Sequence, residues 1–145
     1  MYCTLDELKT RITEKTMAML SNDTSPSTVD EEVVNIAIES ASNLIDGYLL
    51  GHGYTLPLTD TQSILKELCL DISTFYLKKR RPPVPEYEKT NFEQALSTLK
   101  LIQSGAILLN VISDQTGESI TGRANGFFVT SIKKDVIPKK IMDNY

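Results

Sequence analysis

Apolar residues recur every three or four positions along the first third of the chain, which is the spacing of one face of an α-helix. In the N-terminal segment this face comprises Leu5, Leu8, Ile12 and Met19. Thr4 and Glu7 have the spacing of a capping box, a pair that satisfies free backbone amides at a helix start. The pattern therefore predicts a first helix from Leu5 to about Leu20.

A second, longer helix is predicted from Val29 to about Gly51. Thr28 and Glu31 form another capping-box pair, and Gly51-His52-Gly53 supplies the glycines at which helices commonly end. One broad apolar stripe runs along this segment: Val34, Ala37, Ile38, Ala41, Leu44, Ile45, Tyr48 and Leu49. A stripe this wide indicates contact with several neighbours, so we expect this helix to be central.

Two more helices follow, a third from near Asp60 and a fourth from about Glu86 to Gln103. The third ends before Pro82-Pro83-Val84-Pro85, because proline lacks the amide donor of a helix and restricts the residue before it. Gly105 stands where a C-terminal glycine cap belongs.

Four apolar residues leave the main stripes of the second and third helices: Ile36, Leu50, Leu70 and Leu77. Each is a candidate contact with another subunit or with a partner protein. The alternative is a second internal packing face, and the sequence leaves both interpretations open.

Beyond Gly105, Ile107–Ile112 is predicted as a short strand or buried extended segment, followed by a turn at Asp114–Glu118. From Ser119 the chain is expected to be an extended or flexible arm. The arm contains three β-prone apolar residues that are candidate contacts with a partner: Phe127, Phe128 and Ile132.

With 145 residues and 41% apolar composition the chain can bury one core, and a second independent core is not expected. We predict a mainly α fold, a compact bundle of about four helices over residues 1–112, with an extended C-terminal arm over residues 113–145.

The net charge of −4 is unevenly spread along the chain. Residues 119–145 hold five basic and two acidic side chains, a balance of +3, and the preceding body has a balance of −7. The opposite signs of the two balances would help one subunit's arm to lie on its neighbour. A solvated surface of mixed charge explains the same charge distribution equally well.

No apolar run approaches the roughly 18 residues needed to cross a bilayer, so we expect no membrane partner. The start, Met1-Tyr2-Cys3-Thr4, lacks the pattern of a signal peptide, and a cytoplasmic location is expected.

The sequence offers no recognisable catalytic or metal centre. Cys3 and Cys69 have no zinc-site spacing and are expected to be free buried thiols. His52 is the only histidine and lies at a predicted helix end, where it commonly meets carbonyl groups. We therefore expect no catalytic residues, no metal and no cofactor.

Lys78, Lys79, Arg80 and Arg81 form the one sharp charge cluster and are candidate nucleic-acid contacts. Their position at a helix C-terminus has a structural explanation, because cations complement the negative end of the helix dipole. The acidic body also argues against a dedicated DNA-binding protein. A small nucleic-acid-binding or regulatory helical module remains the alternative function.

Several segments in order resemble the small head-tail connector, or head-completion, proteins of tailed phages and prophages, specifically the Mu-like group. The matching segments lie within residues 2–105 and are Tyr2–Leu8, Ala41–Leu49, Tyr54–Leu58, Leu68–Ile72 and Phe75–Leu77. The most specific part is Ile45-Asp46-Gly47-Tyr48-Leu49 followed closely by Tyr54-Thr55-Leu56-Pro57-Leu58. The sequence departs from the family at Gly51-His52-Gly53, where an arginine usually precedes the tyrosine.

The resemblance implies a non-catalytic adaptor in the virion, at the head-tail junction, assembled in the host cytoplasm. In that role copies form a homo-oligomeric ring beneath the portal protein and join it to tail or stopper proteins, while the isolated chain can be monomeric. DNA would pass through the channel without specific binding.

Overall fold

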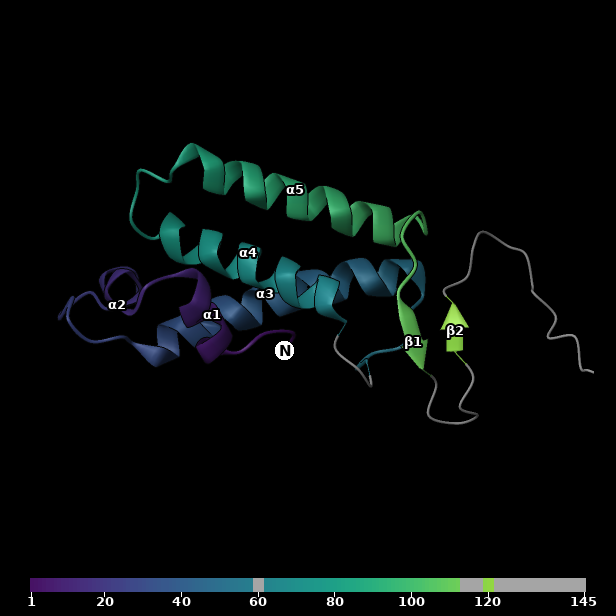
Figure 1. Cartoon of the computed structure of the whole chain (residues 1–145), viewed down its shortest axis with the longest axis horizontal. Helices are drawn as coiled ribbons and strands as arrows, with labels where there is room; N and C mark the ends of the chain where they lie inside the picture. Colours follow the sequence, from purple (N-terminus) through teal and green to yellow (C-terminus); the bar gives the residue numbers. More distant parts are fainter. Residues whose placement is uncertain (59–61, 113–118, 122–145) are drawn as a thin grey trace, which may run out of the picture.

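A computed structural model describes residues 1–58, 62–112 and 119–121. Its elements are α1 (Leu5–Arg11), α2 (Glu14–Ser21), α3 (Glu31–His52), α4 (Ser63–Lys79), α5 (Glu86–Gln103), β1 (Asn110–Ile112) and β2 (Ser119–Thr121). The three long helices α3, α4 and α5 lie side by side, α1 and α2 lie near the start of α3, and β1 and β2 lie at the opposite end (Figure 1). The predicted fold class, a mainly α compact bundle, is confirmed.

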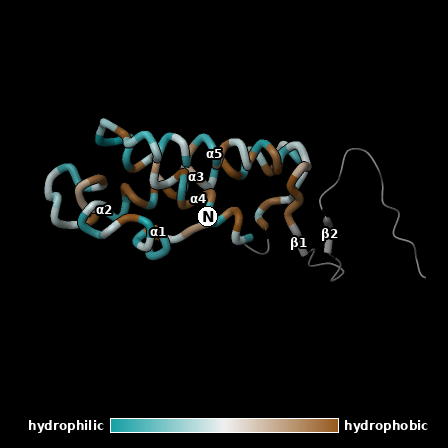
Figure 2. Tube along the Cα trace, turned by 45° about the horizontal axis from the view of Figure 1, so that its top comes forward, coloured by the Kyte–Doolittle hydropathy of each residue, from teal (hydrophilic) through white to brown (hydrophobic). Residues whose placement is uncertain are grey.

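The core lies between the long helices, with α3 in contact with all four other helices as its broad stripe predicted. The largest fully buried side chains of the three long helices are Val34, Ile38, Ile45 and Leu49 from α3, Leu65, Cys69, Ile72 and Leu77 from α4, and Leu99 and Ile102 from α5. Phe75 and Phe92 stack between α4 and α5 with ring centroids 4.1 Å apart. Hydrophobic and hydrophilic residues alternate around the helices, as amphipathic packing requires (Figure 2).

The prediction of one helix from Leu5 to about Leu20 is wrong, because the chain turns at Ile12 and starts a new helix. Ile12 is extended, with φ −121° and ψ 126°, and the Thr13 hydroxyl accepts a hydrogen bond from the Thr16 amide at 3.3 Å. This cap resets the helical phase, so Met19, expected on the buried face, is 52% exposed.

The start of α3 also differs from the prediction, since Asp30 rather than Thr28 is the capping residue. Its carboxylate accepts a hydrogen bond from the Val33 amide at 3.2 Å, and its own amide donates to the Ser21 hydroxyl at 2.9 Å. The glycine end is confirmed, because Gly53 has φ 93°, a left-handed conformation that glycine adopts without a steric penalty.

Leu70 and Leu77 do not reach the surface, which corrects their assignment as candidate subunit contacts. Leu70 is 4% exposed and Leu77 is fully buried. The reason is that α4 packs against α1 and α2 as well as against α3 and α5, so both of its apolar faces are covered internally.

The segment after α5 is extended, as predicted, although the strand is shorter. A hydrophobic stretch runs from the end of α5 toward β1 (Figure 2), and the Leu109 amide donates to the Tyr54 hydroxyl at 3.0 Å. β1 pairs antiparallel with β2, with Val111 opposite Ile120. The predicted turn at 114–118 lies outside the described residues, as does the predicted arm apart from β2, so the division at residue 112 stays a prediction.

Candidate functional site

The outer side of α3 carries a row of exposed residues at helical spacing: Ile36, Ser40, Asn43, Gly47 and Leu50. We call this row the α3 face. Its ends are large and apolar, since Ile36 is 56% and Leu50 is 60% exposed. A Cβ atom at Gly47 would meet no atom of the described residues within 4 Å, so no packing among those residues requires a glycine there.

A shallow groove of about 460 Å³ adjoins the Ile36 end of the α3 face. It lies between α3 and α4 and is lined by Val33, Ile36, Ala37, Ser40, Tyr76 and Arg80. Burial raises the pKa of Tyr76. Most of the lining is apolar, and Ser40 and Arg80 add polar groups, a mixture typical of protein contact surfaces.

The α3 face contains the two predicted contacts that the structure leaves at the surface, Ile36 and Leu50. Sequence reasoning missed the three residues between them, although the spacing from Ile36 to Leu50 would have shown that they share a face. Phe127, Phe128 and Ile132, the predicted contacts in the arm, lie outside the described residues.

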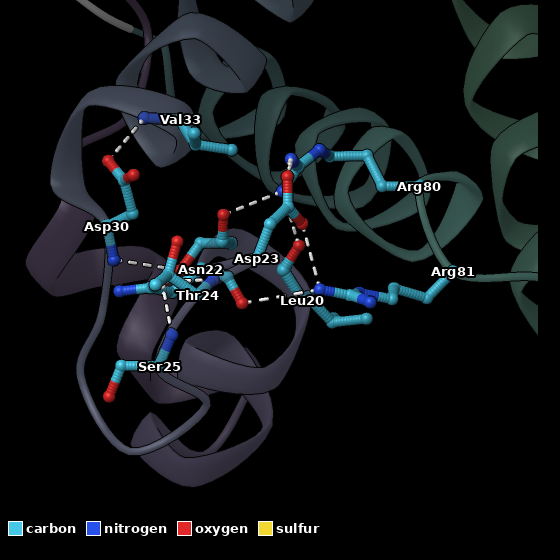
Figure 3. A network of polar contacts seen from close by, with 10 residues as sticks. Leu20, Asn22, Asp23, Thr24, Ser25, Asp30, Val33, Arg80 and Arg81 are labelled. Atoms are coloured by element: carbon cyan, nitrogen blue, oxygen red, sulfur yellow. Dashed lines mark hydrogen bonds and ion pairs between the residues drawn. The ribbon is translucent and has the colours of Figure 1, made fainter.

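Arg80 and Arg81 of the basic cluster point toward the end of α2 (Figure 3). Arg80 donates hydrogen bonds to the carbonyl oxygens of Leu20 at 2.6 Å and Ser21 at 2.8 Å, and it pairs with Asp23 at 3.0 Å. Arg81 contacts the opposite oxygen of Asp23 at 2.8 Å. Both guanidinium groups therefore satisfy polar groups at the C-terminus of another helix, a long-range role that the local charge pattern did not indicate.

Lys78 is also engaged within the chain. Its ammonium group pairs with the buried carboxylate of Glu88 and donates to the Tyr87 hydroxyl at 3.1 Å. Burial lowers the pKa of Lys78, but the hydrogen bond to Glu88 outweighs it and the pKa lies above its ordinary value. Within the described part of the chain, Lys79 is the member of the cluster for which we find no ion pair.

His52, at the end of α3, connects that helix to the end of α5. Its Nδ1 lies 3.0 Å from the Gln103 carbonyl oxygen, so that nitrogen carries the proton. Its Nε2 is buried with no hydrogen-bond partner among the described residues. A Cβ atom on Gly105 would lie 2.9 Å from Cε1 of the ring, so the histidine packs closely against the α5 cap.

Two features are absent from the residues that the structure describes. No group of three or more histidine, cysteine, aspartate or glutamate side chains is placed there to hold a metal ion. No helix in the described ranges is long and apolar enough to cross a membrane.

Comparisons with known proteins define the class as a protein of Mu-like phages and prophages. The chain is 32% identical to the Mu-like prophage FluMu protein gp36 of Haemophilus influenzae over 123 residues, which is 84% of this chain and 85% of that protein. It is 35% identical to gene product J of Escherichia phage Mu over 82 residues, 56% of this chain and 57% of that protein.

The family described as Bacteriophage Mu, Gp36 matches residues 2–127, and the chain belongs to this family. The resemblance to the Mu-like group is thereby confirmed, and the match extends beyond the helical body into the segment predicted as the arm.

Proposed function

We propose that the protein is a head-tail connector: copies form a ring beneath the portal and join the capsid vertex to the tail. The observation that carries the proposal is the α3 face, which places two large apolar side chains on the outside of a body of three packed long helices. Membership of a phage family supports the proposal, because virion assembly requires proteins that repeat identical contacts around a ring.

Ile36 and Leu50 are the proposed anchors of the subunit contact. Full burial of one such side chain contributes about 1.5–3 kcal/mol, so the pair can stabilise each contact without making the isolated chain oligomerise strongly. The small residues between them, including Gly47, allow a neighbouring backbone to approach α3 closely.

The arm is the proposed second contact. Residues 119–145 of the arm carry a net charge of +3, opposite in sign to the −7 of residues 1–118, and Phe127, Phe128 and Ile132 are apolar residues that a neighbour or the portal protein can bury. Removal of residues 122–145 should weaken assembly on the portal more than it lowers the melting temperature. Equal losses in both measurements would contradict a role for the arm in binding.

The proposed role is structural rather than enzymatic and needs no cofactor. His52 supports this, because its protonated nitrogen is committed to the Gln103 carbonyl and the ring packs against the cap of α5. Proposed partners are further copies of the chain, the portal protein, tail or stopper proteins and DNA in transit. Assembly would start in the host cytoplasm and end at the head-tail junction of the virion.

The alternative, a nucleic-acid-binding or regulatory module that uses Lys78–Arg81, is less well supported. Three of the four cations already bind groups of the same chain, and a phosphate would have to compete with Asp23 and Glu88. Binding to duplex DNA that weakens steeply with salt and is lost on replacement of all four residues by alanine would favour it.

The direct test of the connector role is deletion of the gene from its own phage or prophage. We expect heads and tails to accumulate separately, and purified protein added to the extract to restore joining. Normal tailed particles formed without the protein would contradict the proposal.

A further inference from the structure

Two cysteine side chains that are far apart in sequence meet inside the body. Cys3 precedes α1, Cys69 lies in the middle of α4, and their Sγ atoms are 2.9 Å apart. Both are free thiols, and both are buried. The sequence predicted two free buried thiols but gave no sign that they touch, because 66 positions separate them.

The N-terminal segment is held in place by contacts other than the two sulfurs. The Tyr2 amide donates to the Ser42 hydroxyl at 3.3 Å, and the Tyr2 hydroxyl donates to the Asp46 carboxylate, so residue 2 is tied to α3. Thr4 caps α1 directly after Cys3. These contacts fix the backbone on both sides of Cys3 without help from the two sulfurs. The fixed backbone places the Cys3 sulfur beside that of Cys69.

The surroundings favour one thiolate and one thiol in the pair. The thiol of Cys3 donates a hydrogen bond to Cys69, and with the nearby hydroxyls of Ser42 and Ser73 it lowers the pKa of Cys69 despite burial. The same hydrogen bond raises the pKa of Cys3. Since the thiolate is the reactive form of cysteine, the lowered pKa at one member of the pair favours reaction of the pair with an oxidant.

A surface pocket of about 390 Å³ lies beside one member of the pair. Its lining consists of Met1, Tyr2, Cys3, Thr4, Leu5, Glu7, Asn35 and Lys66. Cys3 is thus both a member of the pair and part of the pocket wall, while Cys69 lies behind it.

We infer that Cys3 and Cys69 form an intramolecular disulfide when the protein meets a small thiol oxidant, linking the N-terminal segment covalently to α4. The geometry of the sulfurs carries this inference, which does not depend on the connector role. In a reducing cytoplasm the pair remains as two thiols, and an oxidising environment outside the cell converts it.

The reaction can be written with an azodicarboxamide oxidant such as diamide. Cys3, which lines the pocket, passes its proton to the Cys69 sulfur and then attacks one nitrogen of the N=N bond as the thiolate, forming an S–N bond, and the second nitrogen takes up a proton from water. The Cys69 sulfur then attacks the Cys3 sulfur. The S–S bond forms, the S–N bond breaks, and the proton of the Cys69 thiol ends on the released nitrogen. The two thiols are oxidised to one disulfide, and the oxidant is reduced to its hydrazine.

The test treats the reduced full-length protein with diamide and measures intact mass under denaturing, non-reducing conditions. We expect a monomer that has lost two hydrogen atoms, with the tryptic peptide containing Cys3 joined to the one containing Cys69. The melting temperature should rise by about 5–15 °C, because the new link constrains the unfolded chain over a long loop. Dithiothreitol should reverse both changes.

Cys3→Ser and Cys3→Ala are matched controls that keep Cys69, and neither should lose hydrogen or gain thermal stability on treatment. Two free thiols remaining in the treated wild-type protein, under conditions that oxidise the same chain unfolded in guanidinium, would overturn the inference. Cross-linking between chains without a linked pair inside one chain would also overturn it.

Discussion

Replacement of Arg80 by alanine tests whether the basic cluster serves the fold. The guanidinium group makes two hydrogen bonds to carbonyl oxygens of α2 and one ion pair with Asp23. Hydrogen bonds that involve a charged group contribute about 1.5–3 kcal/mol when well buried. The side chain of Arg80 is 33% exposed and that of Asp23 is 70% exposed, so water replaces part of what is lost and the ion pair adds about 0–1 kcal/mol.

We therefore expect Arg80→Ala to lower the free energy of unfolding by about 1–3 kcal/mol. The assay is urea unfolding followed by circular dichroism, supported by the melting temperature, which should fall by about 2–4 °C per kcal/mol in a chain of this length. Arg80→Lys should recover only part of the loss, because one ammonium group cannot reproduce the planar fork of guanidinium.

Lys79→Ala is the matched control, because Lys79 is an exposed cation for which we find no ion pair among the described residues. The unfolding free energy of this variant should stay within about 0.5 kcal/mol of the wild type. If Arg80→Ala is as stable as the wild type, the capping role is refuted. Loss of DNA binding without loss of stability would instead favour the nucleic-acid alternative.

Three further predictions concern the core, the α3 face and pH. Leu77→Ala should lower the unfolding free energy by about 2–5 kcal/mol because Leu77 is fully buried, whereas Leu101→Ala, at a position 47% exposed, should cost under about 1 kcal/mol in the same urea titration. Gly47→Ala should stabilise the isolated chain by about 0.5–1 kcal/mol in thermal melts, because alanine favours a helix more than glycine does. The same variant should assemble less well on the portal, and equal or better assembly would show that no neighbour approaches α3 at residue 47. Lys78 has a raised pKa in the fold, so its contribution is complete below the unfolded value of about 10.4 and is lost as pH rises through the folded value. Urea titrations should show the wild type losing stability above that pH more steeply than Lys78→Met, and parallel curves would contradict the pairing with Glu88.

The sequence predicted the long helices because apolar periodicity and glycine or proline boundaries are local signals. It did not predict the break at Ile12, since the apolar spacing continues through the segment and only the hydroxyl of Thr13 marks a new start. The same limit explains α4: apolar residues on two faces indicate two contacts, but the pattern cannot tell whether α1 and α2 or another subunit covers the second face. Leu77 is fully buried in a helix that contacts both short helices as well as α3 and α5.

Part of the candidate site could be predicted from the sequence, because that part depends on local apolar spacing. Ile36 and Leu50 stand out because they leave the apolar stripe of their own helix, and their exposure is confirmed. The partners of Arg80 and Cys3 depend on contacts between segments more than 50 positions apart, which no local pattern records.

The central claim is that the α3 face joins copies of the chain on the portal. The most direct measurement is the mass of the complex that the protein forms on a purified portal ring of the same phage. The wild type is compared with an Ile36→Asp/Leu50→Asp variant. The control is Asn35→Asp, which adds a negative charge at a neighbouring exposed position of α3. We expect full assembly for the wild type and Asn35→Asp, and little or none for the double variant, with all three folded by circular dichroism. Full occupancy of the portal by the folded double variant would contradict the claim.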